Sequence, residues 1–310
     1  MPNRKEAPRT GTGQESEAAA NDGAFQLLIA SGKGGTGKTT VLGSFAALAH
    51  SKVIADADVD APNLHLLLSP KQLEDRPYSG AELAVVDRDA CTECGRCTEV
   101  CEFLAIRDGL VDPRRCEGCA TCSIVCPAEA ITMQPQITGR LYLSDTRFGL
   151  LVHARLLAGA EASGRLVSHV REVARTAAED GGVDLILTDG SPGIGCPVIA
   201  SLSGVDAALA ITEPTPSGRH DLERVLQLAA HFRVPTAVSV NKWDINPALA
   251  DEIERLVREL GAVPMRRLPF DEAVAEATAQ AIPIVEWNNG EAAKSMRALW
   301  DDILSWDALS

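Results

Sequence analysis

A glycine-rich loop near the start of the chain has the composition and spacing of a phosphate site. Residues 32–39 read GKGGTGKT and fit the pattern G-x-x-x-x-G-K-[ST]. The glycines let backbone N–H groups turn toward phosphate oxygens, and a helix directly after the loop would present its positive end to the same anion. We expect Lys38 to reach the β- and γ-phosphates of a nucleotide and the Thr39 hydroxyl to bind Mg²⁺. The expected nucleotide contacts in this segment are Gly34, Gly35, Thr36, Gly37, Lys38, Thr39 and Thr40.

Two acidic segments are placed to complete this site. Asp189 follows the apolar run VDLILT, and open α/β sheets bind ligands at the carboxyl ends of their strands. We therefore expect Asp189 to hold Mg²⁺ through water. The second segment, residues 56–64, reads DADVDAPNL. The sequence does not separate the roles of its aspartates Asp56, Asp58 and Asp60, and a turn or capping role is open for one of them.

Eight of the nine cysteines lie between residues 91 and 126, in two runs with the same spacing, C-x2-C-x2-C-x3-C. The runs are Cys91, Cys94, Cys97 and Cys101, followed by Cys116, Cys119, Cys122 and Cys126. The repeat extends to their neighbours: Val86-Asp87 recurs as Val111-Asp112, and Ala105-Ile106 as Ala130-Ile131. Two copies of one small unit therefore stand side by side. Disulfides are rare in a reducing cytosol, so this concentration of cysteine indicates metal binding.

The repeated spacing resembles that of bacterial ferredoxins, which hold [4Fe–4S] clusters. In that pattern three thiolates of one run wrap a cubane, and the fourth cysteine ligates the cluster of the other run. The resemblance implies one cluster on Cys91, Cys94, Cys97 and Cys126 and a second on Cys101, Cys116, Cys119 and Cys122. Zinc is the alternative, but its sites usually have paired C-x2-C units separated by a longer gap. One departure is that Glu102, not proline, follows Cys101, which could alter the potential of the second cluster.

Apolar runs and helical segments alternate around these motifs. Strands are expected at 25–30, 52–55, 183–188, 207–212, 236–241 and 265–268, and helices at 40–50, 151–180, 217–232, 249–260 and 290–305. This alternation predicts an α/β fold with a doubly wound, mainly parallel sheet that is covered on both faces. The polar segment 70–80 looks like a domain junction. We expect a discontinuous nucleotide domain at 25–75 and 136–310, with an α+β cysteine-rich domain inserted at 83–134.

These motifs together resemble the MinD superfamily of P-loop ATPases, a group that includes MinD, ParA, Mrp and the nitrogenase iron protein. The resemblance lies in the extra lysine of the loop, Lys33, and in residues 56–64 and 189–195, which are similar to switches I and II. In that group the extra lysine reaches the partner's phosphates in a nucleotide-sandwich dimer, and an aspartate at the place of Asp58 positions the attacking water. The resemblance implies ATP hydrolysis in which Lys33, Lys38 and Asp58 are the catalytic residues.

Residues 241–244, which read NKWD and match N-K-x-D, are candidates for contacts with the base of the nucleotide. In GTPases the aspartate of this motif reads guanine. In the MinD group the asparagine sits on adenine, and a segment like residues 268–271 flanks the base. Resemblance over the whole chain favours ATP, with contacts from Asn241, Pro269 and Asp271, while GTP stays open as the alternative.

Resemblance to MinD-superfamily ATPases with an inserted ferredoxin domain leaves three functions open. The leading one is an ATP-gated electron-transfer protein. It would couple nucleotide-driven dimerisation and switch movement to electron transfer through its two clusters to an unidentified redox partner. An iron–sulfur or metallocentre assembly ATPase of the Mrp type would give a cluster to an apo-acceptor. A positioning ATPase would need a membrane helix, but the C-terminal segment 296–310 is acidic and is expected to pack on the core. The resemblance implies a homodimer, or a heterodimer with a related ATPase.

Composition argues against two classes of partner. The net charge is −14 and the isoelectric point about 4.9, so nucleic acid and anionic membranes are both disfavoured. No apolar run approaches the roughly 20 residues of a membrane span. Residues 1–24 lack the apolar core of a signal peptide and are expected to form a disordered tail, which predicts a cytoplasmic protein.

The ninth cysteine, Cys196, follows Asp189 by seven positions. The nitrogenase iron protein has a cysteine at the corresponding place, where it ligates a cluster shared between subunits. That cluster needs a second cysteine from each subunit, and residues 127–188 contain none. We therefore expect Cys196 to be an ordinary buried thiol.

Overall fold

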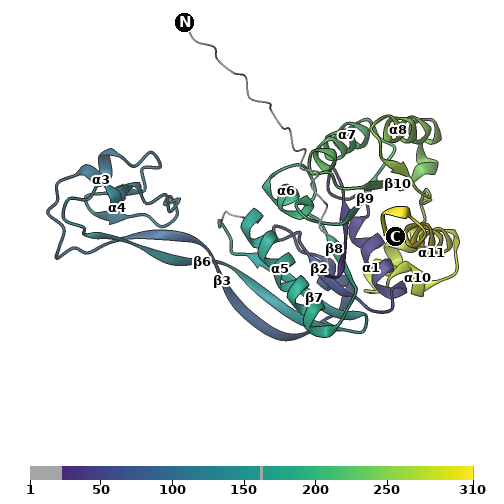
Figure 1. The fold of residues 1–310 in the computed structure, drawn as a ribbon, viewed down its shortest axis with the longest axis horizontal. Coiled ribbons are helices and arrows are strands. Elements are labelled where there is room, and N and C mark those ends of the chain that lie inside the picture. Colours follow the sequence, from purple (N-terminus) through teal and green to yellow (C-terminus); the bar gives the residue numbers. More distant parts are fainter. Residues whose placement is uncertain (1–22, 161–162, 310) are drawn as a thin grey trace, which may run out of the picture.

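A nine-stranded sheet forms the centre of the computed structural model, which describes residues 23–160 and 163–309 (Figure 1). The strand order is β11-β10-β9-β1-β8-β2-β7-β6-β3. Strands from β11 to β7 are parallel, whereas β6 is antiparallel to both of its neighbours. Six strands of the parallel part are β1 (Phe25–Ala30), β2 (Val53–Asp56), β8 (Leu185–Asp189), β9 (Ala207–Thr212), β10 (Thr236–Val240) and the edge strand β11 (Val263–Pro264). The other three strands are β7 (Gly149–Leu156), β6 (Ile131–Thr146) and β3 (Lys71–Val86). The tail expected at residues 1–24 lies, apart from its last two residues, outside the described residues.

Helices cover both faces of the sheet, as a doubly wound fold requires (Figure 1). Alternate residues of β1 point to opposite faces, so Leu27 and Ile29 join one core cluster and Leu28 and Ala30 another. The first face carries α1 (Lys38–Leu48), α2 (Leu64–Leu68), α9 (Glu272–Ala279), α10 (Ile284–Trp287) and α11 (Glu291–Leu304). The second carries α5 (Ser163–Gly181), α6 (Cys196–Leu202), α7 (Pro216–His231) and α8 (Pro247–Glu259).

Helix α11 packs on the core, as its apolar residues predict. Leu299, Trp300 and Ile303 are buried, and the Trp300 ring lies 4.8 Å from that of Phe45, centroid to centroid. Leu304 is on the opposite side and is 54% exposed. None of the described helices is long and apolar enough to cross a membrane.

One predicted helix is wrong at its start. Residues 151–180 were expected to be helical throughout, but β7 (Gly149–Leu156) precedes helix α5. The first part of the segment pairs in parallel with β2 and buries Leu151, Val152 and Ala154. Its apolar residues fill both faces of a central strand, and such a run does not distinguish strand from buried helix by periodicity.

A long antiparallel ribbon joins the sheet to the cysteine-rich segment. It is made of β3 (Lys71–Val86) and β6 (Ile131–Thr146), so the segment 70–80 is mostly strand. Residues 139–146 also pair with β7, whereas residues 131–138 have β3 as their neighbour in the sheet. At about 3.3 Å per residue this free part extends roughly 25 Å beyond the sheet. Figure 1 shows residues 87–130 at its far end, away from the helices of the nucleotide domain.

The two copies of the sequence repeat adopt the same local structure. Helices α3 (Arg96–Glu99) and α4 (Thr121–Ile124) occupy equivalent positions, and the hairpin β4 (Ile106–Arg107) and β5 (Leu110–Val111) lies between them in sequence. The copies also exchange backbone hydrogen bonds: Asp87 N–H donates to Ala130 O (2.8 Å), and Asp112 N–H donates to Ala105 O (2.7 Å). The unit is therefore pseudo-symmetric, with each half completing the other.

Candidate functional site

The glycine-rich loop connects β1 to α1, at the carboxyl edge of the sheet. Gly37 precedes the helix with φ of 100°, and a Cβ there would lie 2.5 Å from Asn241 Nδ2. Only glycine fits this position without strain or collision. The Asn241 amide donates to Thr36 O at 2.8 Å, so the end of β10 braces the loop.

Thr39 and Asp189, the two residues expected to hold Mg²⁺, lie together at the loop. The Thr39 hydroxyl donates to Asp189 Oδ2 at 2.7 Å and lies 3.0 Å from Asn63 Oδ1. Asp189 is 1% exposed, and its other oxygen, Oδ1, has no hydrogen-bond partner among the described residues. Lys38 is nearly as buried. A buried carboxylate oxygen without a partner is costly, and a hydrated cation held by Thr39 and Asp189 would satisfy it.

The three aspartates of residues 56–64 separate into different roles. Asp56 is fully buried, and its carboxylate accepts hydrogen bonds from the backbone N–H groups of Asp58 (3.1 Å) and Leu64 (3.2 Å). Asp56 therefore holds the loop in shape, which is the turn role left open by the sequence. Asp60 is exposed. Asp58 is half-buried. Its charge interacts with that of Lys38, which indicates that Asp58 lies on the Lys38 side of the site.

Burial dominates the electrostatics of these carboxyls. It raises the pKa of Asp189 to about 6, although the charge of Lys38 and the hydrogen bond from Thr39 act in the opposite direction. Burial also raises the pKa of Asp56 well above its ordinary value, and the neighbouring charge of Asp189 adds to the effect. The two residues are paired in register across β2 and β8. Because the two carboxyl groups are buried close together, each disfavours ionisation of the other. A bound cation would favour the ionised carboxylates instead.

Lys33 is held by its own chain. Its Nζ donates to Thr215 Oγ1 (3.3 Å) and Ser217 Oγ (3.4 Å) and lies 3.7 Å from Glu213 Oε2. The other oxygen of Glu213 accepts a hydrogen bond from Lys242 Nζ at 2.6 Å. Glu213 thus joins two lysines at the edge of the phosphate loop. Sequence reasoning missed this residue, although its place directly after strand β9 could have indicated it.

The segments expected around the base lie together. Asn241 forms a bridge with Leu268, which brings residues 269–271 beside it. Asp271 caps helix α9 by accepting from Ala273 N–H at 2.9 Å. Asp244 of the NKWD segment accepts from the backbone N–H of Phe270 at 2.8 Å. The aspartate that would read guanine is thus engaged by the backbone of the segment expected to flank the base.

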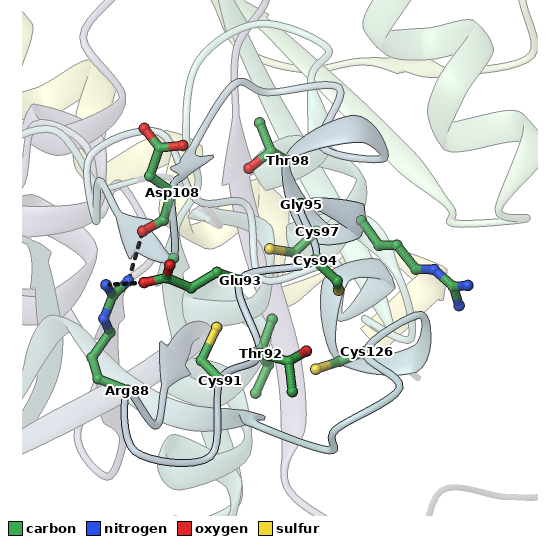
Figure 2. A pocket seen from close by; sticks show the side chains of 13 residues that line it. Arg88, Cys91, Thr92, Glu93, Cys94, Gly95, Cys97, Thr98, Asp108 and Cys126 are labelled. Carbon is green, nitrogen blue, oxygen red and sulfur yellow. Dashed lines mark hydrogen bonds and ion pairs between the residues drawn. The ribbon is translucent and has the colours of Figure 1, made fainter.

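A cavity of about 330 Å³ lies in the first half of the cysteine unit (Figure 2). Four cysteines line it: Cys91, Cys94, Cys97 and Cys126. Three come from the first run and one from the second, which is the first ligand set that the ferredoxin resemblance implies. Arg88 also lines this cavity and was not expected from the sequence.

A smaller cavity in the other half, of about 20 Å³, has the complementary lining. Its cysteines are Cys101, Cys116, Cys119 and Cys122. Among the described residues no group of His, Cys, Asp or Glu is placed to hold a metal ion. A four-iron cubane is wider than one ion and separates its thiolates further, so the grouping of four cysteines around each cavity is the relevant fit. Each cavity is lined by four cysteines, which is the donor set of such a cluster.

Cys196 contradicts the expectation of a buried thiol. It is the first residue of α6 and is exposed. The buried side of α6 carries Val198, Ser201 and Leu202, and Cys196 lies off that side. An added Cβ at Gly164 would lie 3.3 Å from the Cys196 Cβ.

Comparison with known proteins places the nucleotide site in a family. Residues 27–284 match the family described as the CobQ/CobB/MinD/ParA nucleotide binding domain. The uncharacterized protein MJ0578 of Methanocaldococcus jannaschii is 31% identical over 282 residues, which cover 90% of this chain and 96% of the relative. The iron-sulfur cluster carrier protein of the same organism is 22% identical over 279 residues, or 84% of this chain and 77% of the carrier.

Solved structures share the fold. The septum site-determining protein MinD of Pyrococcus horikoshii, complexed with Mg-ADP, matches with a TM-score of 0.57 and 16% identity. The match covers 91% of this chain and 96% of that one. The similarity supports the parallel sheet and its helical layers.

Proposed function

Because this chain belongs to the CobQ/CobB/MinD/ParA family of nucleotide-binding domains, we propose that it is an ATPase that passes electrons through two [4Fe–4S] clusters. The main support for electron transfer is the set of residues that line the two cysteine cavities. Each takes three cysteines from one run and the fourth from the other, which is the arrangement of two-cluster ferredoxins. When bound, the clusters would supply one-electron steps between external one-electron carriers.

The nucleotide site supports hydrolysis through four side chains. Lys38 would neutralise the β- and γ-phosphates, and Thr39 with Asp189 would hold Mg²⁺. Asp58, half-buried near Lys38, would orient the attacking water. Phosphoryl transfer depends mainly on positioning and charge stabilisation, so a rigid arrangement of these groups is the main requirement.

The base is proposed to be adenine. Asp244 is engaged by Phe270 N–H, and Asn241 braces the loop beside the segment that contains Pro269 and Asp271. The Mg-ADP in the similar MinD structure is in keeping with this choice.

Dimerisation is proposed from the position of Lys33. In the single chain it rests on Glu213 and two hydroxyls at the rim of the site and remains partly exposed, so it is free to be exchanged for another anion. The phosphates of a nucleotide bound by a second copy, or by a related ATPase, are an anion of the right kind. Lys33→Ala should then bind ATP yet hydrolyse it poorly.

Anaerobic reconstitution tests the proposal most directly. The full chain should bind about eight iron and eight sulfide, and its clusters should be reduced and reoxidised without loss. The matched variants are Cys126→Ser and Cys196→Ser. The first should damage the cluster held by Cys91, Cys94 and Cys97, and the second should leave both clusters intact. Stoichiometric zinc without acid-labile sulfide would contradict the assignment.

A carrier function is the second candidate, favoured by similarity to the iron-sulfur cluster carrier protein. A carrier must release its cluster, whereas four cysteines around each cavity favour retention. The two functions are separated by incubating the reconstituted protein with an apo-ferredoxin in the presence of ATP. Retention of both clusters supports electron transfer, and their appearance on the acceptor supports the carrier.

A further inference from the structure

The two cysteine cavities come from equivalent halves of the repeat, yet they are surrounded by different charges. The first is lined by Arg88, Glu93, Arg96 and Asp108, whereas the lining described for the second has one charged side chain, Glu117. The other residues of the second lining include the apolar Val100, Phe103, Ile106, Val111 and Met133. The first cavity is also much larger. The halves therefore offer a bound cluster different surroundings.

Arg88 lines the same cavity as the thiol of Cys91, and its guanidinium is directed toward Glu93 and the Asp108 backbone (Figure 2). Its Nη1 donates to Asp108 O at 2.6 Å, and its Nη2 lies 3.3 Å from Glu93 Oε1. A Cβ at Gly109, where φ is 68°, would lie 2.3 Å from Arg88 Nη1 and 3.8 Å from Cys91 Sγ. Glycine at this position therefore leaves room for the guanidinium in the cavity that Cys91 also lines. The Asp108 carboxylate is turned away from the cysteines in Figure 2.

The second half of the repeat has no equivalent cation. The residue at the place of Arg88 is Pro113, and that at the place of Arg96 is Thr121. Two arginines adjoin the second cysteine run in sequence, but they do not line its cavity. Arg114 and Arg115 instead pair with Asp112, at 3.2 and 3.8 Å.

Charge and polarity act in the same direction on reduction. Adding one electron to a cluster adds one negative charge, which a nearby guanidinium stabilises and an apolar, acid-lined cavity disfavours. Hydrogen bonds to sulfur also matter. Ala105 N–H donates to Cys101 Sγ at 3.3 Å and Ala130 N–H to Cys126 Sγ at 3.4 Å, one for each cavity. Backbone N–H groups of residues 119, 121, 122 and 123 add hydrogen bonds to Cys119 and Cys122, which line the second cavity. The Thr121 hydroxyl, 3.4 Å from a thiol of the second cavity, acts in the opposite direction. These hydrogen bonds come from neutral donors, whereas the Arg88 guanidinium carries a full positive charge, so we expect the charge to dominate.

We propose that Arg88 makes the cluster of the first cavity the more easily reduced of the two. The inference rests on the proposed function, since it requires both clusters to be resident. It assigns the second, apolar cavity to the lower potential. An electron shared between the clusters would then reside mainly on the cluster held by Cys91, Cys94, Cys97 and Cys126.

The test is a potentiometric titration of the reconstituted full chain with dithionite, followed by electron paramagnetic resonance. Wild-type protein should show two reduction waves. In Arg88→Gln the wave at higher potential should move to lower potential. The equilibrium constant for reduction should fall only several-fold, because the half-exposed guanidinium is partly screened by solvent. Arg114→Gln is the matched control, since it removes an exposed arginine that does not line a cavity, and neither wave should move.

Glu93→Gln provides a second variant with the opposite sign. Removing the carboxylate that partly neutralises Arg88 should move the same wave to higher potential. The inference is overturned if the lower wave responds instead, or if both clusters reduce together and neither variant shifts them. Failure of the chain to bind iron and sulfide would instead overturn the proposed function, and this inference with it.

Discussion

The nucleotide site and the cysteine unit differ in what holds them in place. The phosphate loop and its acidic partners sit at the ends of buried strands, and Lys38, Asp56 and Asp189 are all buried. Between residues 87 and 130 the buried apolar side chains are Ala105 and Ile106 in one copy and Ala130 in the other. The first region is organised by a large core, and the second has little core of its own.

This difference identifies where each site gets its stability. A unit as small as residues 87–130 buries too little apolar surface to fold firmly without disulfides or metal. None of its eight cysteines is in a disulfide. We infer that bound clusters stabilise the cysteine unit, whereas the nucleotide site is shaped in advance of its ligand.

The largest expected effect follows from removing iron and sulfide. Amide protection between residues 87 and 130 should be lost, because metal binding and folding are coupled in small metal-dependent units. Strands β1, β2 and β8 should keep their protection, since their core does not include the insert. Hydrogen exchange with mass spectrometry measures both regions in one sample, and restoring the clusters should restore protection. Persistent protection of residues 87–130 in the metal-free chain would show that the unit folds unaided.

The second prediction concerns turnover at the preorganised site. Asp58→Asn should retain ATP affinity but lose roughly 10²- to 10⁴-fold in turnover, the usual range for a residue that positions or activates a nucleophile. Asp60→Asn is the matched control because Asp60 is exposed in the same loop. Steady-state hydrolysis and equilibrium binding with a non-hydrolysable analogue separate the two parameters. Equal turnover in the Asp58 variant and the wild type would remove Asp58 from the mechanism.

The sequence was most informative where local spacing determines structure. The loop at residues 32–39 and the placement of Asp189 after a strand were predictable because a phosphate site needs a strand, a glycine turn and a helix in immediate succession. The regrouping of cysteines, with Cys126 in the first cavity, was also accessible, because the repeated spacing resembles that of bacterial ferredoxins, in which the fourth cysteine of each run serves the other cluster.

Long-range packing explains what the sequence did not reveal. Strand β7 was missed because its apolar residues face helices on both sides of the sheet. The ribbon of β3 and β6 was missed because it is largely solvated, with a polar composition typical of a junction. The Arg88 contact with Asp108 O depends on the turn at Gly109, some twenty positions away, which no local pattern encodes.

The third prediction concerns the stability of the nucleotide site without its cation. Burial holds the pKa of Asp189 at about 6, against an ordinary value of 3.8, so the folded state binds the proton more tightly than the unfolded chain does. The stabilisation of the folded state by protonated Asp189 is present in full below about pH 4 and is lost as the pH rises to about 6. Asp189→Asn should therefore stabilise the metal-free protein at pH 7 by roughly 1–3 kcal/mol. Urea unfolding at pH 4.5 and 7 measures the difference, with the exposed Asp184→Asn as control. If the free energy of unfolding of Asp189→Asn at pH 7 is equal to or lower than that of the wild type, ionisation of Asp189 does not destabilise the folded protein.

The smallest expected effect is coupling between the nucleotide site and the cysteine unit. A few hydrogen bonds connect the loop near the phosphate site to the base of the ribbon. Val59, in the loop near the phosphate site, accepts a hydrogen bond from Leu156 N–H at 3.3 Å, and the next residue, Leu157, donates to Thr138 O at 2.9 Å. The Thr138 hydroxyl accepts from Gly80 N–H at 3.0 Å, which ties the two strands of the ribbon together where it leaves the sheet. Movement of the loop on nucleotide hydrolysis would thus reach the base of the ribbon.

The free part of the ribbon then separates that base from the cysteines, so we expect a coupling free energy of at most about 1 kcal/mol, the low end of the usual range. It would appear as an ATP dissociation constant that differs by up to about fivefold between oxidised and dithionite-reduced protein. Linkage requires ATP to shift the cluster potentials by the same free energy. Thr138→Val removes the tie to Gly80 N–H and keeps the shape of the side chain, so the redox difference in ATP affinity should shrink while hydrolysis stays near the wild-type rate. Thr132→Val, further along the same strand and exposed, is the matched control. Equal ATP affinities in both redox states, with unchanged potentials on adding ATP, would mean that the cysteine unit is only tethered to the ATPase and communicates with it through a shared partner.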